Sequence, residues 1–476
     1  MQQAPPRILQ ILRTAGYWTA PSIAAVVLYW PGLVCWFQKD DFTFLKLLQL
    51  ARESQGFRWA LFAPLGQGTI RTISERAFFL SFSAMFGLNA LPYRICVFLT
   101  FAASLMLLAS ITAKLTRSRA AGFWAAVFWT VNSAMGVALS WTAIYYYILF
   151  SFTSLAALWL LIRYSETGER RYFLAQWIVF LFGFGVLELN VVYPAFAAAY
   201  AVCCDRRLLF KTLPMFGASA AYAIVHALAA PLPTAGPYRM HLDASIFSTL
   251  WTYWKIALGP VQLIYLRIYP SPFRSLLAIL LMLGLLGFLA FKICCREGPA
   301  VFFALWFLIS MSLVLPLRDH IDQYYLTQAL TGLAMWGAWA AVSGWRASPL
   351  GKSAAVLLVA IYLLVEIPVA RVVCRSFYDR SIRIERVLEG VAAQAGSNKD
   401  ALILLKGVDS DLFWSALSFR PFPVYGLNNV YLLSGESSGI APPVPDSRRS
   451  ELFREPENRQ TLVLDVSGGT VRRSGL

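Results

Sequence analysis

The sequence is poor in charged residues and correspondingly rich in apolar ones. Only 14% of its 476 residues are Asp, Glu, Lys or Arg, whereas 58% are hydrophobic and the mean hydropathy is +0.59. A water-soluble chain of this size could not bury that much apolar surface. The composition therefore predicts a polytopic membrane protein.

Metal-binding and disulfide patterns are also missing. The seven cysteines show no CxxC spacing and no association with histidine. The three histidines are isolated from one another: His226, His241 and His320. Neither a disulfide framework nor a His-rich metal cluster is expected. A small-residue cleavage site is absent after Met1–Gly16, which predicts a retained membrane anchor rather than a signal peptide.

Apolar runs long enough to cross a bilayer dominate the first 371 residues. About eleven are expected, at 17–37, 92–113, 120–137, 140–162, 172–187, 189–204, 212–230, 274–293, 299–317, 323–343 and 353–371. The fifth and sixth runs are short and meet at Glu188. The sequence thus predicts an all-α transmembrane domain over residues 1–371, with two long outer loops at 38–91 and 231–273.

Basic residues mark one side of this domain. With the N-terminus in the cytoplasm, every short inner connection carries Lys or Arg, as the positive-inside rule requires. The two long outer loops also carry basic residues and depart from the rule, but long loops follow it weakly. The net charge of +16 therefore indicates topology and not a nucleic-acid partner. A multi-pass protein of a bacterial-type inner membrane is expected.

Residues 372–476 are more charged, and their apolar stretches are too short to span. Ile382–Ala395 has helical spacing, Ala401–Leu405 is a strand candidate, and Asp411–Ser418 is a further helix candidate. This composition predicts a small extracytoplasmic α/β domain. The Pro/Ser/Gly-rich stretch Ser434–Ser447 and the polar end are predicted to be poorly ordered.

The first outer loop is expected to be folded. Phe42–Arg52 and Thr72–Phe86 have apolar residues at helical spacing, which predicts amphipathic helices at the membrane surface. Gly56–Gly68 between them contains Pro64, Gly66 and Gly68 and is predicted to be a loop.

Polar groups gather where the predicted spans reach the outer side. They are Asp40 and Asp41 after the first run, Glu188, and the segment Arg318–Asp322. Carboxylates at a water–membrane boundary can deprotonate a hydroxyl or hold a divalent cation, and Arg with His can bind a phosphate. Each group also has a purely structural interpretation: a solvated loop start, a helix end that reaches water, or local ion pairs.

Several short motifs resemble those of the GT-C superfamily of membrane glycosyltransferases. They are the aspartate pair Asp40-Asp41, the run Phe62-Ala63-Pro64-Leu65, the run Phe86–Arg94, the segment Leu187–Pro194, and Asp322-Gln323-Tyr324-Tyr325-Leu326. The chain is similar in these features to protein O-mannosyltransferases and bacterial lipid A aminoarabinose transferases, over residues 20–345. In the last motif Gln323 stands where an Arg is expected, so Arg318 is its substitute.

The resemblance implies a sugar transferase that uses a polyprenyl-phosphate donor at the extracytoplasmic face, with a glycan, lipid or protein as acceptor. It implies Asp40 or Asp41 as catalytic base and Glu188 as a second acid, with Mg²⁺ or Mn²⁺ possible on these three carboxylates. The implied substrate-binding residues are Arg318, His320, Asp322, Tyr325, Arg239 and His241.

Two other hypotheses stay open from the sequence. A transporter or flippase of lipid-linked glycans would place ionisable residues near the bilayer midplane and often shows internal repeats. Here the acids lie at span ends, and no repeat is visible. A non-catalytic scaffold that displays the C-terminal domain is the third hypothesis, since fold alone does not fix function.

The topology can be tested directly. With the N-terminus inside and an odd number of spans, a reporter fused after Leu476 is expected to be active only in the extracytoplasmic compartment. A fusion after Met1 serves as the opposite control. A cytoplasmic signal from the C-terminal fusion would reverse the side assigned to every site residue.

Overall fold

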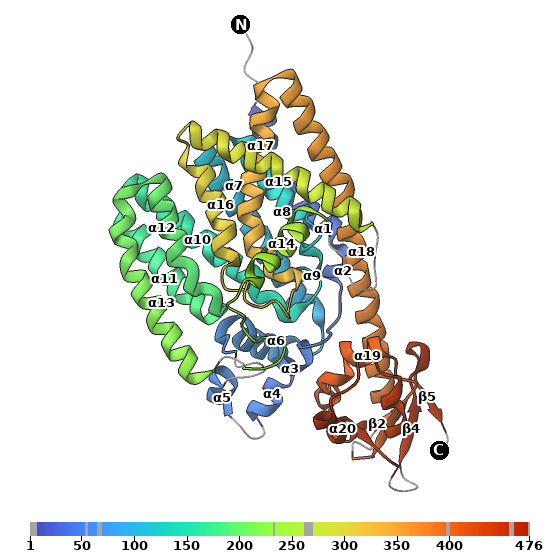
Figure 1. The fold of residues 1–476 in the computed structure, drawn as a ribbon. Coiled ribbons are helices and arrows are strands. Elements are labelled where there is room, and N and C mark those ends of the chain that lie inside the picture. Colours follow the sequence, from blue (N-terminus) through green and yellow to red (C-terminus); the bar gives the residue numbers. More distant parts are fainter. Residues whose placement is uncertain are drawn as a thin grey trace.

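The computed structural model describes residues 7–52, 56–63, 69–231, 234–260, 270–396, 400–456 and 461–474. It consists of a large helical body and a smaller lobe that contains the strands, and the long helix α18 joins the two (Figure 1). The mostly helical architecture that the sequence predicts for residues 1–371 is therefore present.

The helices of the body follow one another along the chain. In order they are α1 (Arg7–Leu28), α2 (Trp30–Leu33), α3 (Asp41–Leu45), α4 (Leu47–Leu50), α5 (Gly56–Phe62), η2 (Thr72–Ala77), α6 (Phe78–Phe86), α7 (Ala90–Thr116), α8 (Arg119–Val131), α9 (Met135–Ala138), η3 (Thr142–Ile144), α10 (Tyr145–Thr167), α11 (Arg170–Val186), η4 (Glu188–Val192), α12 (Tyr193–Cys204), η5 (Arg206–Leu208), α13 (Leu209–Ala229), α14 (Ser245–Leu258), α15 (Ser271–Cys294), α16 (Gly298–Met311), η6 (Gln323–Tyr325), α17 (Leu326–Ala347) and α18 (Pro349–Ala395).

Side-chain caps explain where several of these helices begin. Asn89 accepts a hydrogen bond from the Leu91 amide at the start of α7, and Ser118 accepts one from the Ala121 amide at the start of α8. Such caps satisfy amides that have no partner in the first turn of a helix.

Five described helices are long and apolar enough to cross a membrane. They are 90–116, 142–167, 206–229, 271–294 and 349–395, where helices that follow one another without a break are joined. Shorter apolar helices occur at 16–28, 188–204 and 298–311. The expected runs at 120–137 and 299–317 form helices of only 13 and 14 residues, below the roughly 20 that a perpendicular span needs. The count of eleven spans therefore stays a prediction.

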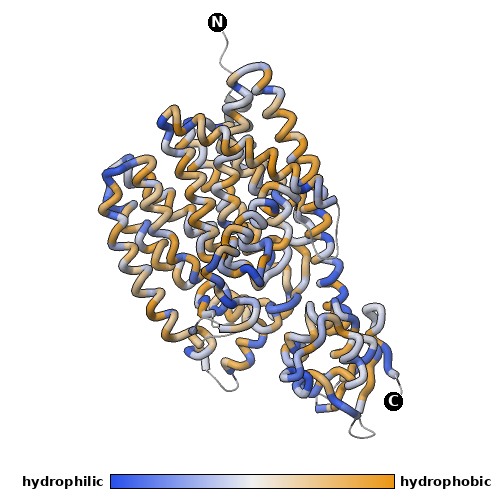
Figure 2. The backbone as a smooth tube through the Cα atoms, in the orientation of Figure 1, coloured by the Kyte–Doolittle hydropathy of each residue, from blue (hydrophilic) through white to orange (hydrophobic). Residues whose placement is uncertain are grey.

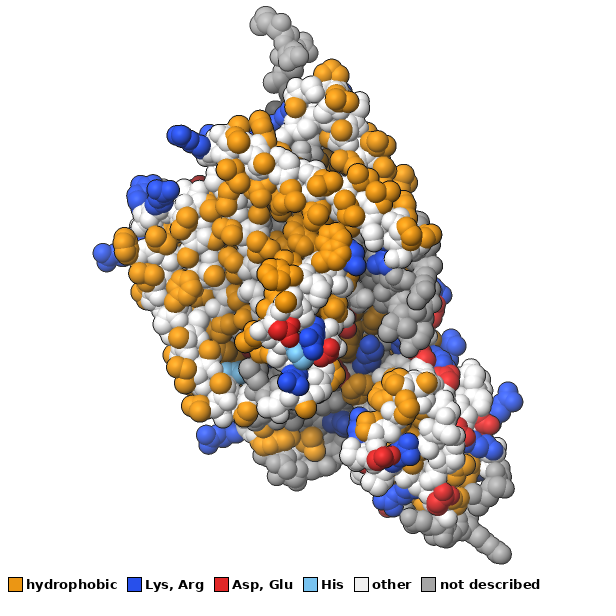
Figure 3. Space-filling model, viewed as in Figure 1, with side chains coloured by type: hydrophobic (Ala, Val, Ile, Leu, Met, Phe, Trp, Pro, Cys, Tyr) orange, Lys and Arg blue, Asp and Glu red, His pale blue; other side chains and the backbone are white. Residues whose placement is uncertain are grey.

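The body presents large apolar side chains on its surface. Phe210 and Leu228 on α13 are 80% exposed, and Leu276 and Leu283 on α15 are more than half exposed. Hydrophobic side chains cover much of this face (Figure 3), and hydrophilic residues concentrate at the helix ends (Figure 2). A patch of this extent is unfavourable in water and suits contact with lipid.

The first outer loop is folded, with one difference from the expectation. α3 and α4 occupy the first predicted helix, and η2 with α6 occupies the second. Gly56–Gly68 was expected to be a loop, but its first seven residues form α5. The reason is the apolar run after Arg58, which buries Ala60 completely. Residues 64–68, which hold the Pro and Gly signals, lie outside the described part.

The second outer loop is also partly helical. α14 lies within residues 231–273 and buries Thr249, Tyr253 and Ala257. Its apolar residues recur at helical spacing, a pattern the loop assignment overlooked.

The last helix is longer than a bilayer requires. α18 has 47 residues, which corresponds to about 70 Å, whereas a hydrocarbon core is about 30 Å thick. It runs without interruption through the boundary expected at residue 371 and includes the helix predicted at Ile382–Ala395. Its second half, with Val387, Leu388 and Val391 buried, carries the lobe.

The lobe contains a five-stranded sheet of order β3-β2-β1-β4-β5. Its strands are β1 (Ile403–Lys406), β2 (Val430–Leu433), β3 (Phe453–Arg454), β4 (Leu462–Asp465) and β5 (Arg472–Ser474). β1 pairs in parallel with β2 and β4, with Leu404 opposite Tyr431 and Val463, and β5 runs antiparallel to β4. The helical elements of the lobe are α19 (Ser410–Ser415), η7 (Leu417–Phe419), η8 (Phe422–Tyr425), η9 (Ser434–Gly439), α20 (Asp446–Leu452) and η10 (Ser467–Gly469).

The polar end is ordered, in contrast to the poor order that its sequence predicts. The end contributes β4 and β5 to the sheet, because Leu462–Leu464 is an apolar triplet whose residues Val463 and Leu464 are buried. Ser434–Ser447 likewise contains η9 and the start of α20. Their polar composition hid these short elements.

Limited trypsin digestion tests whether the first outer loop is folded. Arg71 and Arg76 have little or no exposed side-chain surface, whereas Arg58 on α5 is exposed. We therefore expect cleavage after Arg58 to precede cleavage after Arg71 or Arg76 in membrane vesicles open on this side. Rapid cutting at all three sites would contradict a folded cap.

Candidate active site

A sharp turn precedes the two aspartates that follow the first apolar run. Lys39 has a φ of 53°, in the left-handed region, and its amide donates to the carbonyl of Ser415 in the C-terminal lobe at 2.6 Å. α3 begins directly afterwards. Because of this turn, Asp41 is completely buried, whereas Asp40 keeps partial exposure.

Asp41 is directed into the protein. Its Oδ2 accepts a hydrogen bond from the Gln38 amide at 2.9 Å. Burial raises the pKa of Asp41 to about 8, although the Gln38 amide and Arg94 oppose this shift. A carboxyl group with this pKa is largely protonated at neutral pH and is a poor proton acceptor.

Asp40 is in a different electrostatic environment. Burial raises its pKa above the usual value, and the charges of Lys39 and Arg71 act in the opposite direction. These two cations favour an ionised carboxylate at a place with restricted access to water. Of the two aspartates, Asp40 is the one that can serve as a base.

Arg71 holds two glutamates. Its Nε and Nη2 donate to the two oxygens of Glu188 at 2.8 and 2.6 Å, and its Nη1 donates to Glu75 at 2.5 Å. The guanidinium also lies 3.9 Å from the ring centre of Tyr146. Glu75 is buried and Glu188 is partly exposed. A planar fork with five donors is suited to bridging two carboxylates in this way.

Lys39 links Asp40 to the segment before α17. Burial lowers the pKa of Lys39. The negative charges of Asp322 and, to a smaller extent, Asp40 oppose this shift. Burial raises the pKa of Asp322 to about 6, and Lys39 opposes this shift. The Lys39 ammonium lies 4.4 Å from the ring centre of Trp141.

An aromatic cluster lies against these charges. We define it as Trp141, Tyr146, Tyr147, Tyr238, Tyr324 and Tyr325. Neighbouring ring centres of all its members except Tyr238 are 4.8–6.1 Å apart, for example 5.2 Å between Tyr147 and Tyr324, and Tyr238 is joined by a side-chain hydrogen bond with Tyr324. The rings offer apolar faces, and the tyrosine hydroxyls offer hydrogen bonds, a combination that suits a sugar ring.

His320 belongs to the same cluster of side chains. Its Nε2 is 3.0 Å from the hydroxyl of Tyr324, and its ring centre is 4.3 Å from that of Tyr238. Burial lowers the pKa of His320, so the neutral imidazole is favoured at neutral pH. The expected residues Asp40, Glu188, His320, Asp322 and Tyr325 are thus joined through Lys39, Arg71 and tyrosines.

Three other expected residues lie apart from this group. Arg318 pairs with Asp243 at 3.2 Å and is 42% exposed, and His241 is 2.9 Å from Asp319. Arg239 is exposed. The expectation that Arg318 substitutes for a phosphate-binding Arg has no support in this arrangement, because surface carboxylates already surround its guanidinium.

The carboxylates proposed for a divalent cation do not converge. Glu188 is engaged by both arms of Arg71, and Asp41 is buried against Gln38. Across the described residues, no group of three His, Cys, Asp or Glu could hold a metal ion. The donor set therefore does not fit Mg²⁺ or Mn²⁺.

Sequence reasoning missed the two cations of the site and most of its tyrosines. Lys39 is adjacent to the aspartate pair, and charge alternation in Lys39-Asp40 was an available signal. Arg71 was counted only as an outer-loop basic residue. Nothing in the spacing of Tyr146 and Tyr147 distinguishes site residues from the tyrosines that are common at membrane–water interfaces.

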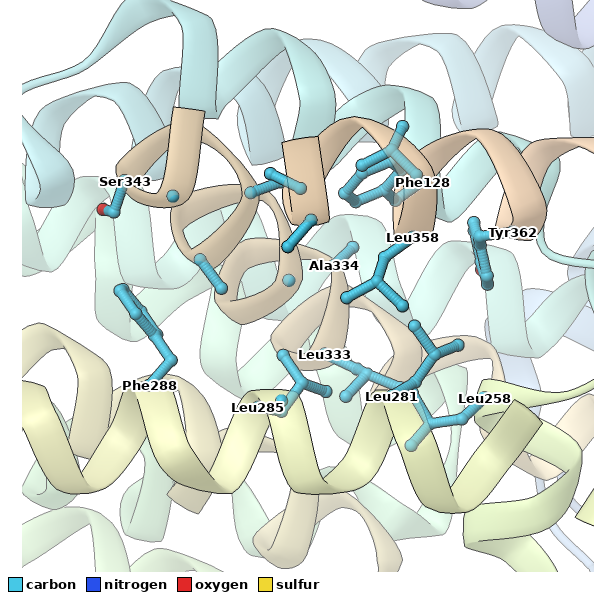
Figure 4. A pocket seen from close by; sticks show the side chains of 18 of the residues that line it. Phe128, Leu258, Leu281, Leu285, Phe288, Leu333, Ala334, Ser343, Leu358 and Tyr362 are labelled. Atoms are coloured by element: carbon cyan, nitrogen blue, oxygen red, sulfur yellow. The ribbon is translucent and has the colours of Figure 1, made fainter. Parts of the chain in front are cut away.

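An apolar groove begins close to this group. It lies between α14, α15, α17 and α18 and has a volume of about 400 Å³. Figure 4 shows Leu258 and Tyr362 at one end and Phe288 and Ser343 at the other. The first residue of α17 that lines the groove is Leu330. It comes five residues after Tyr325, which corresponds to about 7.5 Å along the helix axis.

The fold and the site together are those of a membrane protein with a charged, aromatic-lined centre at a span end. Among solved structures, the chain is similar to the aminoarabinose transferase ArnT of Cupriavidus metallidurans bound to undecaprenyl phosphate. The TM-score is 0.45 and the identity 13%, over 95% of this chain and 93% of ArnT. It is also similar to the Archaeoglobus fulgidus oligosaccharyltransferase, at a TM-score of 0.49 and 10% identity, over 84% of this chain.

Both of these structures are GT-C glycosyltransferases, the superfamily that the sequence motifs resemble. This chain spans 63% of the length of the oligosaccharyltransferase. No protein-family model and no curated protein matches the sequence. TM-scores below 0.5 at such identities do not establish a function, which has to be argued from the site.

A double-mutant cycle tests the role of Arg71. Arg71→Met leaves Glu75 buried without its partner, and breaking a buried pair from one side typically costs about 3–5 kcal/mol. We expect a large loss of thermal stability in detergent. It should be recovered in part in Arg71→Met/Glu75→Gln, which removes the fully buried charge and leaves only the partly exposed Glu188 without its partner, and Glu75→Gln alone completes the cycle. Arg58→Met, at an exposed arginine of the same loop, is the matched control. Equal stability of Arg71→Met and Arg58→Met would refute the role.

Proposed function

We propose that this chain is an integral membrane glycosyltransferase that moves a sugar from a polyprenyl-phosphate donor to an acceptor at the extracytoplasmic face. The observation that carries the proposal is Asp40, a carboxylate between the cations Lys39 and Arg71 at the edge of an aromatic cluster. Ionised groups near lipid are costly and are retained mainly where they act.

Asp40 is the base in the proposed reaction. It takes the proton from the acceptor hydroxyl or amine as the acceptor attacks the anomeric carbon of the donor. The bond between that carbon and the phosphate oxygen breaks, and its electron pair leaves with the polyprenyl phosphate. The configuration at the anomeric carbon is inverted. A positioned base of this kind contributes about 10²–10⁴-fold to the rate.

Lys39 is proposed to hold the donor phosphate. Arg71 already has a glutamate oxygen on each of its arms and has little charge left to offer. The Lys39 ammonium is placed over Trp141 and is subject to the charges of both Asp40 and Asp322. A phosphate there would meet a cation that can also stabilise the charge that develops on the leaving group.

The apolar groove is proposed to hold the first part of the donor's lipid tail. Its lining is hydrocarbon except for Ser343 and Tyr362, and it follows α17 away from Tyr325. One helix thus connects the aromatic cluster, which suits the sugar, with a surface that suits the prenyl chain. Pockets that combine a few polar groups with a large apolar wall are typical of ligand sites.

The transporter hypothesis gains no observation in its favour. The carboxylate that lies within the last predicted span, Glu366, accepts a hydrogen bond from the Ser133 amide at 2.7 Å. It therefore caps the short connection between α8 and α9. Arg94 of α7 likewise donates to the carbonyls of Gly32 and Leu139 and fixes the loop before η3. Both ionisable groups have structural partners.

The two aspartates are predicted to respond differently to the same change. Asp40→Asn keeps the shape and removes the base, so transfer should fall by about 100-fold or more. Asp41→Asn replaces a carboxyl that is largely protonated at neutral pH and should keep most of the activity. The measurement is the release of polyprenyl phosphate by purified full-length protein supplied with a lipid extract of its source cells.

Asp41→Asn is the matched control for expression, insertion and solubilisation. If Asp40→Asn turned over like wild type, Asp40 would be only a loop residue and the transferase assignment would lose its main support. Equal loss in both variants would contradict the division of roles.

A further inference from the structure

A second groove lies between α1 and α18, apart from the candidate active site. Its volume is about 540 Å³. Val27, Leu28 and Pro31 line one side, and Arg371 and Arg375 line the other. The two arginines are four residues apart, so they lie on the same face of α18.

The groove carries a net positive charge. Arg375 pairs with Asp379 at 2.9 Å, and these two side chains balance each other. Arg371 is exposed, and no described residue forms an ion pair with it. One guanidinium is thus left to meet an anion from outside the chain.

The position of Arg371 is at the boundary of the lipid-facing surface. Leu357, Leu364 and Arg371 follow one another at intervals of seven residues on one face of α18, and the first two are 60% and 71% exposed. The side chain on this face changes from apolar to cationic within about 10 Å along the helix. Such a change marks the depth of the lipid head groups.

The opposite wall has matching properties. Ile23, Val27 and Trp30 are 57–60% exposed and recur at helical spacing toward the end of α1 and the start of α2. A tryptophan at the end of an exposed apolar stripe is typical of the membrane–water interface. The groove therefore has an apolar floor continuous with the bilayer and a cationic rim at head-group depth.

We propose that this groove binds one anionic phospholipid. Arg371, supported by Arg375, contacts the lipid phosphate, and an acyl chain lies along Val27 toward Ile23. A guanidinium can bind phosphate through two parallel hydrogen bonds. The apolar floor discriminates against a soluble anion, and the free charge discriminates against a zwitterionic lipid. The site is independent of the proposed transfer reaction.

Lipid binding by the full-length protein tests this proposal. Purified protein in detergent is titrated with phosphatidylglycerol or phosphatidylcholine, and bound lipids are counted by native mass spectrometry. Loss of one cation near a membrane surface should weaken phosphatidylglycerol binding by about fivefold in Arg371→Gln. Phosphatidylcholine binding should be unchanged, and Arg371→Lys, which keeps the charge and loses the two parallel hydrogen bonds, should have a phosphatidylglycerol affinity between those of wild type and Arg371→Gln.

Arg386→Gln is the matched control, since Arg386 is an exposed arginine of the same helix outside the groove. It should bind both lipids like wild type. Equal phosphatidylglycerol affinity in Arg371→Gln and wild type would overturn the proposal. Displacement of the lipid by inorganic phosphate would overturn it in favour of a soluble anion, and selective loss of undecaprenyl phosphate would overturn it in favour of the transfer donor.

Discussion

The cost of an unpaired charge near lipid is the constraint on which the site depends. Arg71 meets this constraint with two glutamates and the face of Tyr146, which leaves the guanidinium fixed on every side. Glu188 is the first residue of η4, and Glu75 lies in the π-helical turn η2, so the Arg71 side chain ties the first outer loop to the helical body. Burial raises the pKa of Asp40, and Arg71, after Lys39, is one of the two charges that oppose this rise, so the same guanidinium also acts on the proposed base.

The C-terminal lobe contributes to the same loop. The carbonyl of Ser415 accepts from the Lys39 amide, and the carbonyl of Phe419 accepts from the Lys46 ammonium at 2.9 Å. On α18, Ser381 accepts from the Trp36 amide at 3.0 Å. These contacts fix the segment that contains Asp40 against the lobe and α18. The length of α18 makes these contacts possible. A helix that ended at the membrane surface could not place the lobe against the first outer loop.

Much of the site could be predicted because ionisable residues at the ends of apolar runs are rare. That signal selects Asp40, Glu188, His320, Asp322 and Tyr325, and Lys39, Arg71 and several tyrosines lie among them in the structure, whereas their role as a site stays a prediction. The intermediates were not predictable. Arg71 is separated from Glu188 by 117 positions, and nothing local indicates which of several loop arginines meets it. Arg318 differs from these residues, because its guanidinium pairs with Asp243 at the surface, and its role as a phosphate ligand stays a prediction.

The fold was predictable to a similar degree. Long apolar runs predict the helical body. The rise in charged residues after residue 371 predicts a separate C-terminal part. Sequence analysis does not find the short elements α5, η9, β4 and β5. Each has too few residues for a helical or strand repeat of apolar side chains to be recognised. The count of spans depends on runs such as α8 and α16, whose helices end after 13 and 14 residues where the chain turns within the body.

The turn at Lys39 explains how two identical neighbours can have opposite roles. Asp40 has helical φ and ψ and Asp41 is the first residue of α3, so their side chains leave the helix axis about 100° apart. The left-handed φ of Lys39 starts α3 so that Asp41 is enclosed against Gln38, while Asp40 precedes the helix beside the two cations. A non-glycine residue in this conformation costs about 1 kcal/mol or more and persists where surrounding contacts require it. Here the hydrogen bond to Ser415 supplies such a contact, so the lobe, the strained turn and the placement of Asp40 depend on one another.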